Sequence, residues 1–585
     1  MAIVPMQKVA VVAHKNYEPD LLEFLHREGV MEISELPEAS LINTLKLPYH
    51  VAELEHVIAV LQPHATKDLI LQTQKHVSPE FILEAGHHSS IRGIIDQTHK
   101  LEQQLSDLKQ QQGDLDHGRL PEEKKKSGGS PEEGAYFTTP GIKSDLSGFG
   151  ESATAPTTSN TIEEHRVKVK LATEDVQNAL VELTQHLPLL VHARTCVRWM
   201  NEIEAGRRAM KTTQSTVTLF GWIAKSLFDP LEKKLHKISP ATALFTVEPL
   251  AGEQAPVLIK NPAWLKPFES VTLLYGLPQN GELDPTPLLA PFFILFFALC
   301  LTDAGYGIIL AVAMAAFIWK KKLKLQDAPL WWLLMLGGIA TFIVSIPFGG
   351  WFGMTPDQAP GFLTETRADG QMWFKGQIWN LGATPGITFF QNLSIVLGLV
   401  HLCFGMVLGG ISKGLRGSWI EGFWMDWTQL LLIGAGLGYA LAPAEWSSVA
   451  LWSIWISLIV VIWGKGYGSV WYMRPLYGFL GLLNLAMGMM SNTLSYLRLL
   501  ALGLVTGALA LAVNLVAEQI GGFMPSILSL PVTIIIYIVG HTANIALNVL
   551  GAFIHSGRLQ FVEFFSQFFE GGGRQFSPFK RSNVL

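Results

Sequence analysis

The sequence predicts an α-helical membrane domain of about eight spans, two of them long tilted helices near the C-terminus. A cytoplasmic α/β lobe with an antiparallel coiled-coil hairpin arm precedes it. The 585 residues are charged and periodic up to about residue 285, and are then dominated by Leu, Ile, Gly, Phe and Trp with charges in short islands. The first residues hold only short apolar pieces and no small-residue cleavage site, so no secretory signal is expected and the front half should stay in the cytoplasm.

The α/β lobe is predicted from two separate segments. KVAVVAH predicts a strand, residues 18–28 predict a helix, and GVMEISEL predicts a second short strand. Residues 217–250 then carry strand, helix and strand signals. This second segment would complete the same lobe.

Two long helices are predicted to form the hairpin arm. Apolar residues recur at intervals of three and four from residue 47 to 115, most clearly in SSIRGIIDQTHKLEQQLSDLKQQ, and again from residue 161 to about 210. Between them, residues 117–160 contain EEKKK, SGGSPEEG and SATAPTTSNT, too few large apolar groups to offset the entropy of ordering. We therefore expect a flexible insert at the tip of two antiparallel helices.

Seven apolar stretches follow, each about long enough for the ~20 residues that cross ~30 Å of hydrocarbon. The first contains DAGYG at residues 303–307, a natural helix break, and its residues at ~1.5 Å each would reach roughly 48 Å, enough for two short or tilted segments. The expected number of spans is therefore eight. The stretches lie near residues 288–319, 329–353, 388–412, 420–441, 446–464, 476–517 and 530–556.

The basic islands near the span ends provide an independent test, because Lys and Arg collect on cytoplasmic loops. With seven spans every island would lie outside, beginning with KKKLK, whereas eight spans place all of them and both termini in the cytoplasm. The loop at residues 353–388 then lies outside, with only Arg367 and Lys375 against the rule. The islands are Lys320, Lys321, Lys322 and Lys324, then Lys413 and Arg416, then Lys465 and Arg474, then Lys580 and Arg581.

Two arginines lie in the last apolar stretches. Arg498, in SNTLSYLRLLALGLVTGALALAVN, has no acid on its own helix nearer than Glu518. A charge inside a span costs roughly 2.5–3.5 kcal/mol on insertion scales, so it either pairs or snorkels for structural reasons or is a fixed positive charge awaiting a carboxylate from elsewhere. We favour the second interpretation for Arg498. Arg558, five residues before Glu563, is nearer a cytoplasmic end, and structural pairing explains it almost as well.

Polar residues also gather along these stretches, and His541, Asn544, Asn548 and His555 recur at near-helical spacing, so much of one helix face is wettable. For any single residue a hydrogen bond between helices is the better explanation, but as a set they suggest a water-lined path. The candidate lining residues are Asn484, Asn492, Ser495, Thr506, Asn514, His541, Asn544, Asn548, His555 and Glu563.

Several classes of function have no support in the sequence. There is no GxxxxGK[ST] phosphate loop, metal-ligand cluster or nucleophile motif, and the three cysteines lie far apart, so we expect no cofactor, metal or disulfide. A net charge of −5 spread over both signs does not indicate nucleic acid. Asp303 is expected to cap the helix after the break, and Glu421 and Asp426 to lie near an interface. The driving energy must come from a gradient or from another subunit.

Three stretches resemble the membrane subunit a, also called subunit I, of V-type and A-type (V/A-type) ATPases, in its short bacterial form. They are residues 257–310, SYLRLLALGL at residues 495–504, and HSGRLQFVEFFSQFFEGGGRQFSPF at residues 555–579. KVAVVAHK near the start and GWIAKSLFDPLEKKL after Phe220 look like the lobe motifs of that family. The resemblance therefore covers nearly the whole chain.

The resemblance implies a stationary subunit beside a rotating proteolipid ring, the c or K ring, whose members each carry a membrane carboxylate. Arg498 would be the essential arginine, favouring the ionised carboxylate and blocking leakage between two offset half-channels, and Arg558 would assist it. Residues 1–285 would be the stator arm, 286–570 the ion-translocation domain and 571–585 a cytoplasmic tail. The implied partners are the ring, the peripheral-stalk E and G subunits, a central-stalk subunit of the d or C type and the lipid bilayer, in a bacterial plasma membrane.

The chain also departs from that family. Relatives often carry an acid or a histidine where this chain has Asn484, Thr506 and Asn548, and a second globular lobe where it has residues 117–160. A self-contained transporter or channel would need an intramembrane acid facing Arg498 within this chain, whereas a non-conducting scaffold would tolerate the loss of Arg498. The sequence does not distinguish proton from sodium, or pumping from ATP synthesis.

Overall fold

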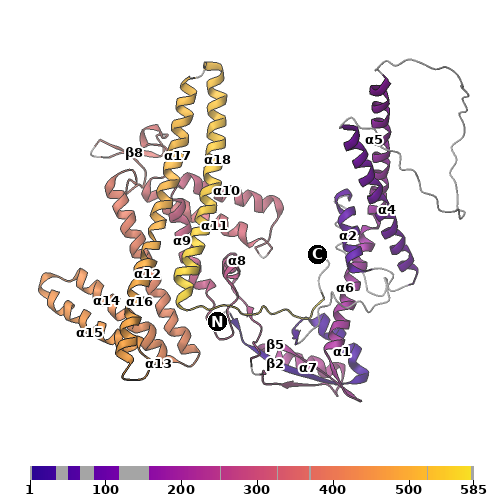
Figure 1. Cartoon of the computed structure of the whole chain (residues 1–585), viewed down its shortest axis with the longest axis horizontal. Coiled ribbons are helices and arrows are strands. Elements are labelled where there is room, and N and C mark those ends of the chain that lie inside the picture. The colour runs from indigo at the N-terminus through magenta and orange to yellow at the C-terminus, as the bar shows by residue number, and fades with distance from the viewer. Residues whose placement is uncertain are drawn as a thin grey trace, which may run out of the picture. The chain divides into compact units, whose positions relative to one another are not determined.

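The computed structural model describes residues 3–34, 50–65, 85–116, 157–250, 252–325, 327–367, 370–523 and 525–581. The chain divides into two compact units, which we call the lobe unit and the membrane unit (Figure 1). The lobe unit comprises Val9–Gly221, Leu227–Thr246 and Pro578–Leu585, and the membrane unit comprises Met1–Lys8, Trp222–Ser226 and Val247–Ser577.

A five-stranded sheet with the order β3-β5-β2-β6, and with β4 paired to β5, is the centre of the α/β lobe. The central position of β5 confirms that residues 217–250 complete the lobe begun by the N-terminal segment. Gly221 allows this packing, because a Cβ there would lie 2.3 Å from the carbonyl oxygen of Glu32. The strands are β2 (Met6–His14), β3 (Met31–Ile33), β4 (Lys211–Thr212), β5 (Thr216–Ala224) and β6 (Ala243–Thr246), and the helices beside them are α1 (Glu18–Glu28) and α7 (Phe228–Ile238).

The arm consists of α2 (Val51–Leu61), α4 (Ala85–Asp116), α5 (Thr157–Leu183) and α6 (Leu187–Ala209). The prediction of one helix from residue 47 to 115 was wrong, because α2 ends before Pro63, which has no N–H for a helical hydrogen bond. Arg166 near the start of α5 pairs with Asp116 at the end of α4 at 3.0 Å, so these helices run antiparallel. Most of the predicted insert, residues 117–156, lies outside the described residues, and the coiled coil stays a prediction.

The membrane unit is dominated by apolar helices. Among the residues that the structure describes, six helical stretches are long and apolar enough to cross a membrane, and α9 is a shorter apolar helix. This supports a multi-pass membrane protein, while the number of eight spans and the orientation of the termini stay predictions. The helices are α9 (Thr286–Leu301), α10 (Ala304–Lys321), α11 (Pro329–Ser345), α12 (Thr384–Leu415), α14 (Thr428–Leu441), α15 (Ser447–Lys465), α16 (Arg474–Ser495), α17 (Leu497–Phe523) and α18 (Ser526–Arg558).

The expected break at DAGYG is confirmed. α9 ends at Leu301, Thr302 adopts a left-handed conformation with φ of 38°, and Asp303 caps α10 by accepting a hydrogen bond from the Tyr306 N–H at 3.0 Å. The following helices α10 and α11 approach closely through glycines, since a Cβ on Gly307 would lie 2.6 Å from the backbone nitrogen of Phe342.

Among the described residues, the last two apolar stretches are the longest of the candidate spans. Arg474–Phe523 contains α16 and α17 in a run of 50 residues, and Ile527–Gln567 contains α18 and a π-helical turn, Leu559–Phe564. Figure 1 shows α17 and α18 side by side. Their predicted tilt is not tested, because the structure contains no membrane.

The remaining elements are short and connect the larger ones. In the lobe unit, the C-terminal segment packs on β3 and α1, where the Phe579 N–H donates to the Met31 carbonyl at 2.8 Å. The short elements of the membrane unit are β1 (Ile3–Val4) paired with β7 (Leu258–Ile259), α8 (Lys266–Tyr275), β8 (Thr364–Thr366) paired with β9 (Met372–Phe374), α13 (Trp419–Gly422) and a π-helical turn, Phe423–Trp427.

Candidate functional site

Arg498 lies at the junction of α16 and α17. α16 ends at Ser495 and α17 begins at Leu497, so the intervening Tyr496 marks a discontinuity in an otherwise apolar helix. The Tyr496 side chain is fully buried, and its hydroxyl is hydrogen-bonded to His401 Nδ1 on α12 at 2.8 Å. α12 makes room with Gly398, where a Cβ would lie 2.5 Å from the tyrosine ring. The junction is therefore anchored two residues before the arginine.

The guanidinium of Arg498 is not neutralised by a direct ion pair. Its Nη1 atom is buried without a hydrogen-bond partner, and no ion pair of Arg498 occurs among the described residues. The charges of Arg498 and Arg558 both act on the carboxylate of Glu563, and both also act on His555. Both arginines thus lie within electrostatic range of His555 and Glu563, although 65 residues separate Arg498 from Glu563 in the sequence.

Glu563 is held in this place by the π-helical turn. Its side chain is 1% exposed, and its Oε2 atom has no hydrogen-bond partner in the described part of the chain. A π-helical turn has a wider hydrogen-bond spacing than an α-helix, and such turns are frequent at functional sites. Here four of its six residues are buried, including Gln560 and Glu563.

Several predicted residues belong to a chain of hydrogen bonds that connects α10, α17 and α18. Asn544 Nδ2 donates to the Tyr306 hydroxyl at 2.8 Å, and this hydroxyl is bonded to His541 Nδ1 at 2.7 Å. His541 Nε2 is bonded to Asn514 Oδ1 at 3.0 Å, and the Asn514 amide donates to the Phe352 carbonyl at 2.8 Å.

The network extends to Thr506, whose hydroxyl donates to Asn548 Oδ1 at 3.0 Å. Hydrogen bonds between helices therefore account for Thr506, Asn514, His541, Asn544 and Asn548. Tyr306 was not among the predicted residues, although it lies within the DAGYG motif that predicted the helix break.

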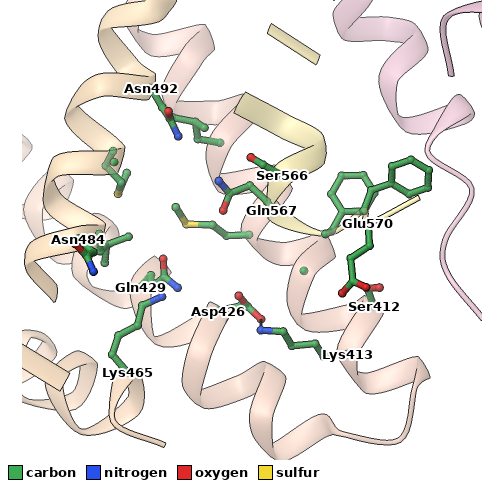
Figure 2. A pocket seen from close by; sticks show the side chains of 18 of the residues that line it. Ser412, Lys413, Asp426, Gln429, Lys465, Asn484, Asn492, Ser566, Gln567 and Glu570 are labelled. Atoms are coloured by element: carbon green, nitrogen blue, oxygen red, sulfur yellow. Dashed lines mark ion pairs between the residues drawn. The ribbon is translucent and has the colours of Figure 1, made fainter. Parts of the chain in front are cut away.

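Two further predicted residues, Asn484 and Asn492, lie around a cavity. The first cavity, of about 450 Å³, lies among α12, α15, α16 and the segment after the π-helical turn. Figure 2 shows Asn484, Asn492, Gln567 and Lys465 around its interior. Two of the predicted residues, Asn484 and Asn492, line this cavity, and the basic islands at Lys413 and Lys465 border it.

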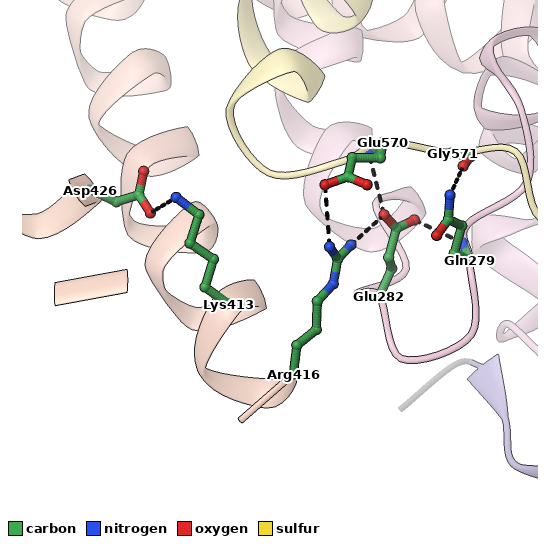
Figure 3. Close-up of polar contacts among 7 residues, drawn as sticks. All are labelled: Gln279, Glu282, Lys413, Arg416, Asp426, Glu570 and Gly571. Carbon is green, nitrogen blue, oxygen red and sulfur yellow. Dashed lines mark hydrogen bonds and ion pairs between the residues drawn. The ribbon is translucent and has the colours of Figure 1, made fainter. Parts of the chain in front are cut away.

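A buried carboxylate organises the rim of the first cavity. Figure 3 shows Arg416 between two acids, with Nη2 at 2.7 Å from Glu282 Oε1 and Nη1 at 3.2 Å from Glu570 Oε1. Glu282 also accepts the backbone N–H of Glu570 at 3.2 Å and that of Gln279 at 2.8 Å. We call this set the Arg416 clasp. It joins the end of α12 to the loop before α9 and to the segment after α18.

Two acids outside the arginine site, Asp426 and Glu269, have polar partners of their own. Asp426 Oδ2 lies 2.9 Å from Lys413 Nζ, beside the clasp (Figure 3). Outside the predicted spans, burial raises the pKa of the Glu269 carboxyl on α8, against the opposing effect of its hydrogen bond with Asn261. Among the described residues, neither Asp426 nor Glu269 forms a hydrogen bond or an ion pair with Arg498.

The second cavity, of about 510 Å³, lies at the helix break. It is lined by Thr302 and Asp303, by parts of the loop between α11 and α12, and by Gly503, Gly507 and neighbouring residues of α17. Asp303 is 1% exposed, and its Oδ2 atom has no hydrogen-bond partner among the described groups.

The two cavities reach the α16–α17 stretch on opposite sides of Arg498. The first touches this stretch from Asn484 to Asn492, and the second touches it from Gly503 to Leu511. At a rise of about 1.5 Å per residue, Arg498 is about 9 Å from Asn492 and about 7.5 Å from Gly503 along the helix. The arginine therefore occupies the interval between two separate cavities.

Comparison with known proteins finds relatives of this chain among ATPase subunits. Residues 483–581 match the model of the V-type ATPase 116kDa subunit family, and this range contains both arginines and every candidate lining residue. The chain is 40% identical over 347 residues to the A-type ATP synthase subunit I of Methanocaldococcus jannaschii, covering 56% of this chain and 49% of that protein.

Two more distant relatives carry similar names. The A-type ATP synthase subunit I of Thermococcus kodakarensis is 29% identical over 63% of this chain and 54% of its own length. The V-type ATP synthase subunit I of Chlamydia muridarum is 26% identical over 62% of this chain and 61% of its own length. In these matches the aligned part is about half of the relative's length, or somewhat more.

Proposed function

Because this chain is a relative of subunit I of V-type and A-type ATPases, we propose that it is the stationary membrane subunit of a rotary V/A-type ATPase and forms both ion half-channels. The single observation that supports this proposal most is the position of Arg498 between two cavities. An ion would enter one cavity, bind a carboxylate of a neighbouring proteolipid ring, travel with the ring and leave through the other cavity.

The electrostatics of the site support this assignment. The guanidinium of Arg498 stays charged at every physiological pH, so it favours the ionised form of a carboxylate that passes it. The Arg498 side chain is only partly buried, and it has no ion pair among the described residues, which supports a role toward a group on another subunit. A fixed cation between the cavities would also repel an ion moving directly from one to the other. Arg558 would reinforce this field from α18.

The partners follow from the same proposal. The ring would lie against α17 and α18, and the lobe unit and arm would contact peripheral-stalk subunits of the E and G type and a central-stalk subunit. Lys413 and Lys465 border the first cavity, so this cavity would open to the cytoplasm. The second cavity would open to the opposite side of the bilayer.

One observation favours a second candidate function, a self-contained transporter or channel. That class needs an acid of this chain near Arg498, and Glu563 lies close enough for the arginine charge to act on it. Ion conductance by the purified chain in liposomes would support this class, whereas the rotary proposal predicts conductance only with the ring present.

Accessibility from the two sides of the membrane tests the half-channels. In a variant whose three native cysteines are replaced by alanine, Asn492→Cys should react with a membrane-impermeant thiol reagent only from the cytoplasmic side. Gly507→Cys should react only from the opposite side, and it should be tolerated because a Cβ there has no atom within 4 Å. Mass spectrometry of the labelled chain measures both reactions.

The control is Leu499→Cys, since Leu499 is fully buried and should react from neither side. If Cys196 is left in place, its reaction with the thiol reagent should be slow. Burial raises the pKa of its thiol, and the thiolate is the reactive form. Labelling of positions 492 and 507 from the same side would refute the two-channel proposal.

A further inference from the structure

Helix α8 has one buried face and one exposed apolar face. Its buried residue Phe268 belongs to the same apolar core cluster as Leu333 of α11, and α8 contacts both α9 and α11 (Figure 1). On the other side, Leu273 is 51% exposed and Leu274 is 66% exposed. Trp264, in the turn that leads into α8, is also 66% exposed. The helix is therefore amphipathic, although its outer face is apolar.

This helix lies at the same end of the helical bundle as the lysine-rich turn between α10 and α11. Leu333 belongs to the first turns of α11, so α8 packs against the beginning of that helix. Lys324, the last lysine of the turn, precedes the start of α11 at Pro329 by only five residues. α8 also precedes α9 directly in the chain. The outer face of α8 and the lysine-rich turn therefore border the same end of α9, α10 and α11.

Exposed tryptophans mark this end of the bundle on three neighbouring elements. Trp264 precedes α8, and Trp319, which is 84% exposed, lies near the end of α10. Trp331 lies in the first turn of α11, where its ring centroid is 4.6 Å from that of Phe317. Tryptophan is enriched where hydrocarbon meets water, because its large ring is apolar while its N–H group binds polar partners. This distribution is typical of the membrane–water boundary.

Lysines gather on the same surface and outnumber the acids near them. Within the described ranges none of these lysines forms an ion pair, and all except Lys266 are exposed. Three acids lie nearby, namely Glu269, Asp284 and Asp327, and Asp284 is buried and bonded to the Asn261 amide at 2.9 Å. The surface therefore carries a net positive charge. Its six lysines are Lys260, Lys266, Lys320, Lys321, Lys322 and Lys324.

We propose that this surface is a binding site for anionic phospholipids, with α8 lying along the membrane surface instead of crossing it. The apolar side chains enter the acyl region, and the lysines bind the headgroup phosphates, which their long stems can reach. Clusters of four or more basic residues directly beyond a span favour anionic lipids. This lipid site goes beyond the proposed function and does not depend on the ion path. We call the surface the α8 collar, and it consists of the six lysines with Trp264, Leu273, Leu274, Trp319 and Trp331.

A phospholipid fits the α8 collar better than an acidic segment of another protein does. The helix Ala304–Lys321 is long and apolar enough to cross a membrane, so the lysines at its end lie at the level of the headgroups when it does. A phospholipid supplies both a phosphate for the lysines and acyl chains for the exposed leucines and tryptophans. An acidic polypeptide segment satisfies the lysines but leaves the apolar side chains in water, which is unfavourable.

Removal of the lysine charges tests the headgroup contacts. Native mass spectrometry of the full chain, released from detergent that contains equal amounts of phosphatidylglycerol and phosphatidylcholine, counts the lipids that stay bound. The wild-type chain should retain phosphatidylglycerol in preference to phosphatidylcholine. The variant K320Q/K321Q/K322Q/K324Q should lose at least about tenfold of this preference, because each lysine near an anionic surface contributes roughly fivefold.

The matched control removes the same number of charges from the lobe unit. The variant K168Q/K170Q/K233Q/K237Q changes four exposed lysines of α5 and α7, and it should keep the wild-type preference for phosphatidylglycerol. An equal loss in both variants would overturn the proposal, because the preference would then follow the total charge and not the α8 collar. A wild-type chain without any preference would overturn it as well.

Spin labels test the insertion of α8 in nanodiscs that contain both lipids. In a chain whose native cysteines are replaced by alanine, a nitroxide at Leu274→Cys should be more accessible to oxygen, which concentrates in hydrocarbon, than to a water-soluble nickel complex. At Lys260→Cys the order should be reversed.

Equal access of the nickel complex to both labels would contradict insertion. If the label at position 274 is exposed to water in nanodiscs and becomes shielded only in an assembled complex, a protein partner covers the α8 collar and the lipid proposal is overturned. Neither measurement involves ion pumping, so a failure of the proposed function would leave both expected results unchanged.

Discussion

Replacing Arg498 with glutamine is expected to abolish ATP-driven ion pumping by the assembled complex. Glutamine keeps polarity and part of the length of the side chain but removes the charge, so the passing carboxylate loses the cation that favours its ionised form. We expect pumping to fall by at least about a hundredfold, which corresponds to ~2.7 kcal/mol. ATP-driven acidification or sodium uptake by liposomes measures the effect.

Two comparisons make this result specific. Arg498→Lys keeps a positive charge on a flexible stem without the planar guanidinium, so it should retain more pumping than the glutamine variant. Arg166→Gln removes an arginine whose ion pair with Asp116 is exposed, and it should pump normally. Unimpaired pumping by Arg498→Gln would instead support a scaffold that does not conduct ions.

Replacing Glu282 with glutamine should give the second-largest effect, a loss of stability. The Glu282 side chain is 1% exposed and accepts hydrogen bonds from Arg416 and from the backbone N–H groups of Gln279 and Glu570. An amide replaces one of its two accepting oxygens with a donor, so one of these groups loses its acceptor. We expect a loss of about 2–3 kcal/mol, moderated because the Arg416 side chain is 37% exposed.

Thermal unfolding of the purified chain in detergent, followed by tryptophan fluorescence, checks this prediction. Glu163→Gln is the control, because Glu163 pairs with Arg166 at 3.5 Å with both side chains exposed and the loss should be at most about 1 kcal/mol. Equal shifts in the two variants would show that the Arg416 clasp does not stabilise the membrane unit.

The parts of the fold that depend on local sequence were predicted correctly. Strand β2, helix α1 and strand β3 follow from apolar periodicity over a few residues, and the break between α9 and α10 follows from DAGYG. By contrast, the break at Tyr496 has no local signal, because SNTLSYLRLL contains neither proline nor glycine. It depends on the burial of Tyr496 against α12, which is a tertiary contact.

The same distinction applies to the site. The sequence singles out Arg498, Arg558 and Glu563, because a charge in an apolar stretch is conspicuous in any sequence. His401, which is bonded to the Tyr496 hydroxyl, was not singled out, because its partner depends on which helices face each other. The sequence also gave no means of separating Asn492, which lines a cavity, from Asn544, which is bonded to Tyr306.

The relation between Arg498 and Glu563 bears on the alternatives. The sequence leaves open a transporter with its own acid facing Arg498, and Glu563 lies near enough for their charges to interact. The two residues nevertheless form no ion pair in the described part of the chain, and each has one buried atom without a hydrogen-bond partner. The proposed function therefore requires the carboxylate that Arg498 meets to come from another subunit.

A structure of the assembled complex that resolves the side chains around residue 498 tests the central claim most directly. We predict that the Arg498 guanidinium faces a carboxylate of an adjacent proteolipid, with one cavity open to each side of the bilayer. An Arg498 side chain that faces lipid, or that is locked to Glu563 with no rotor subunit beside it, would contradict this account.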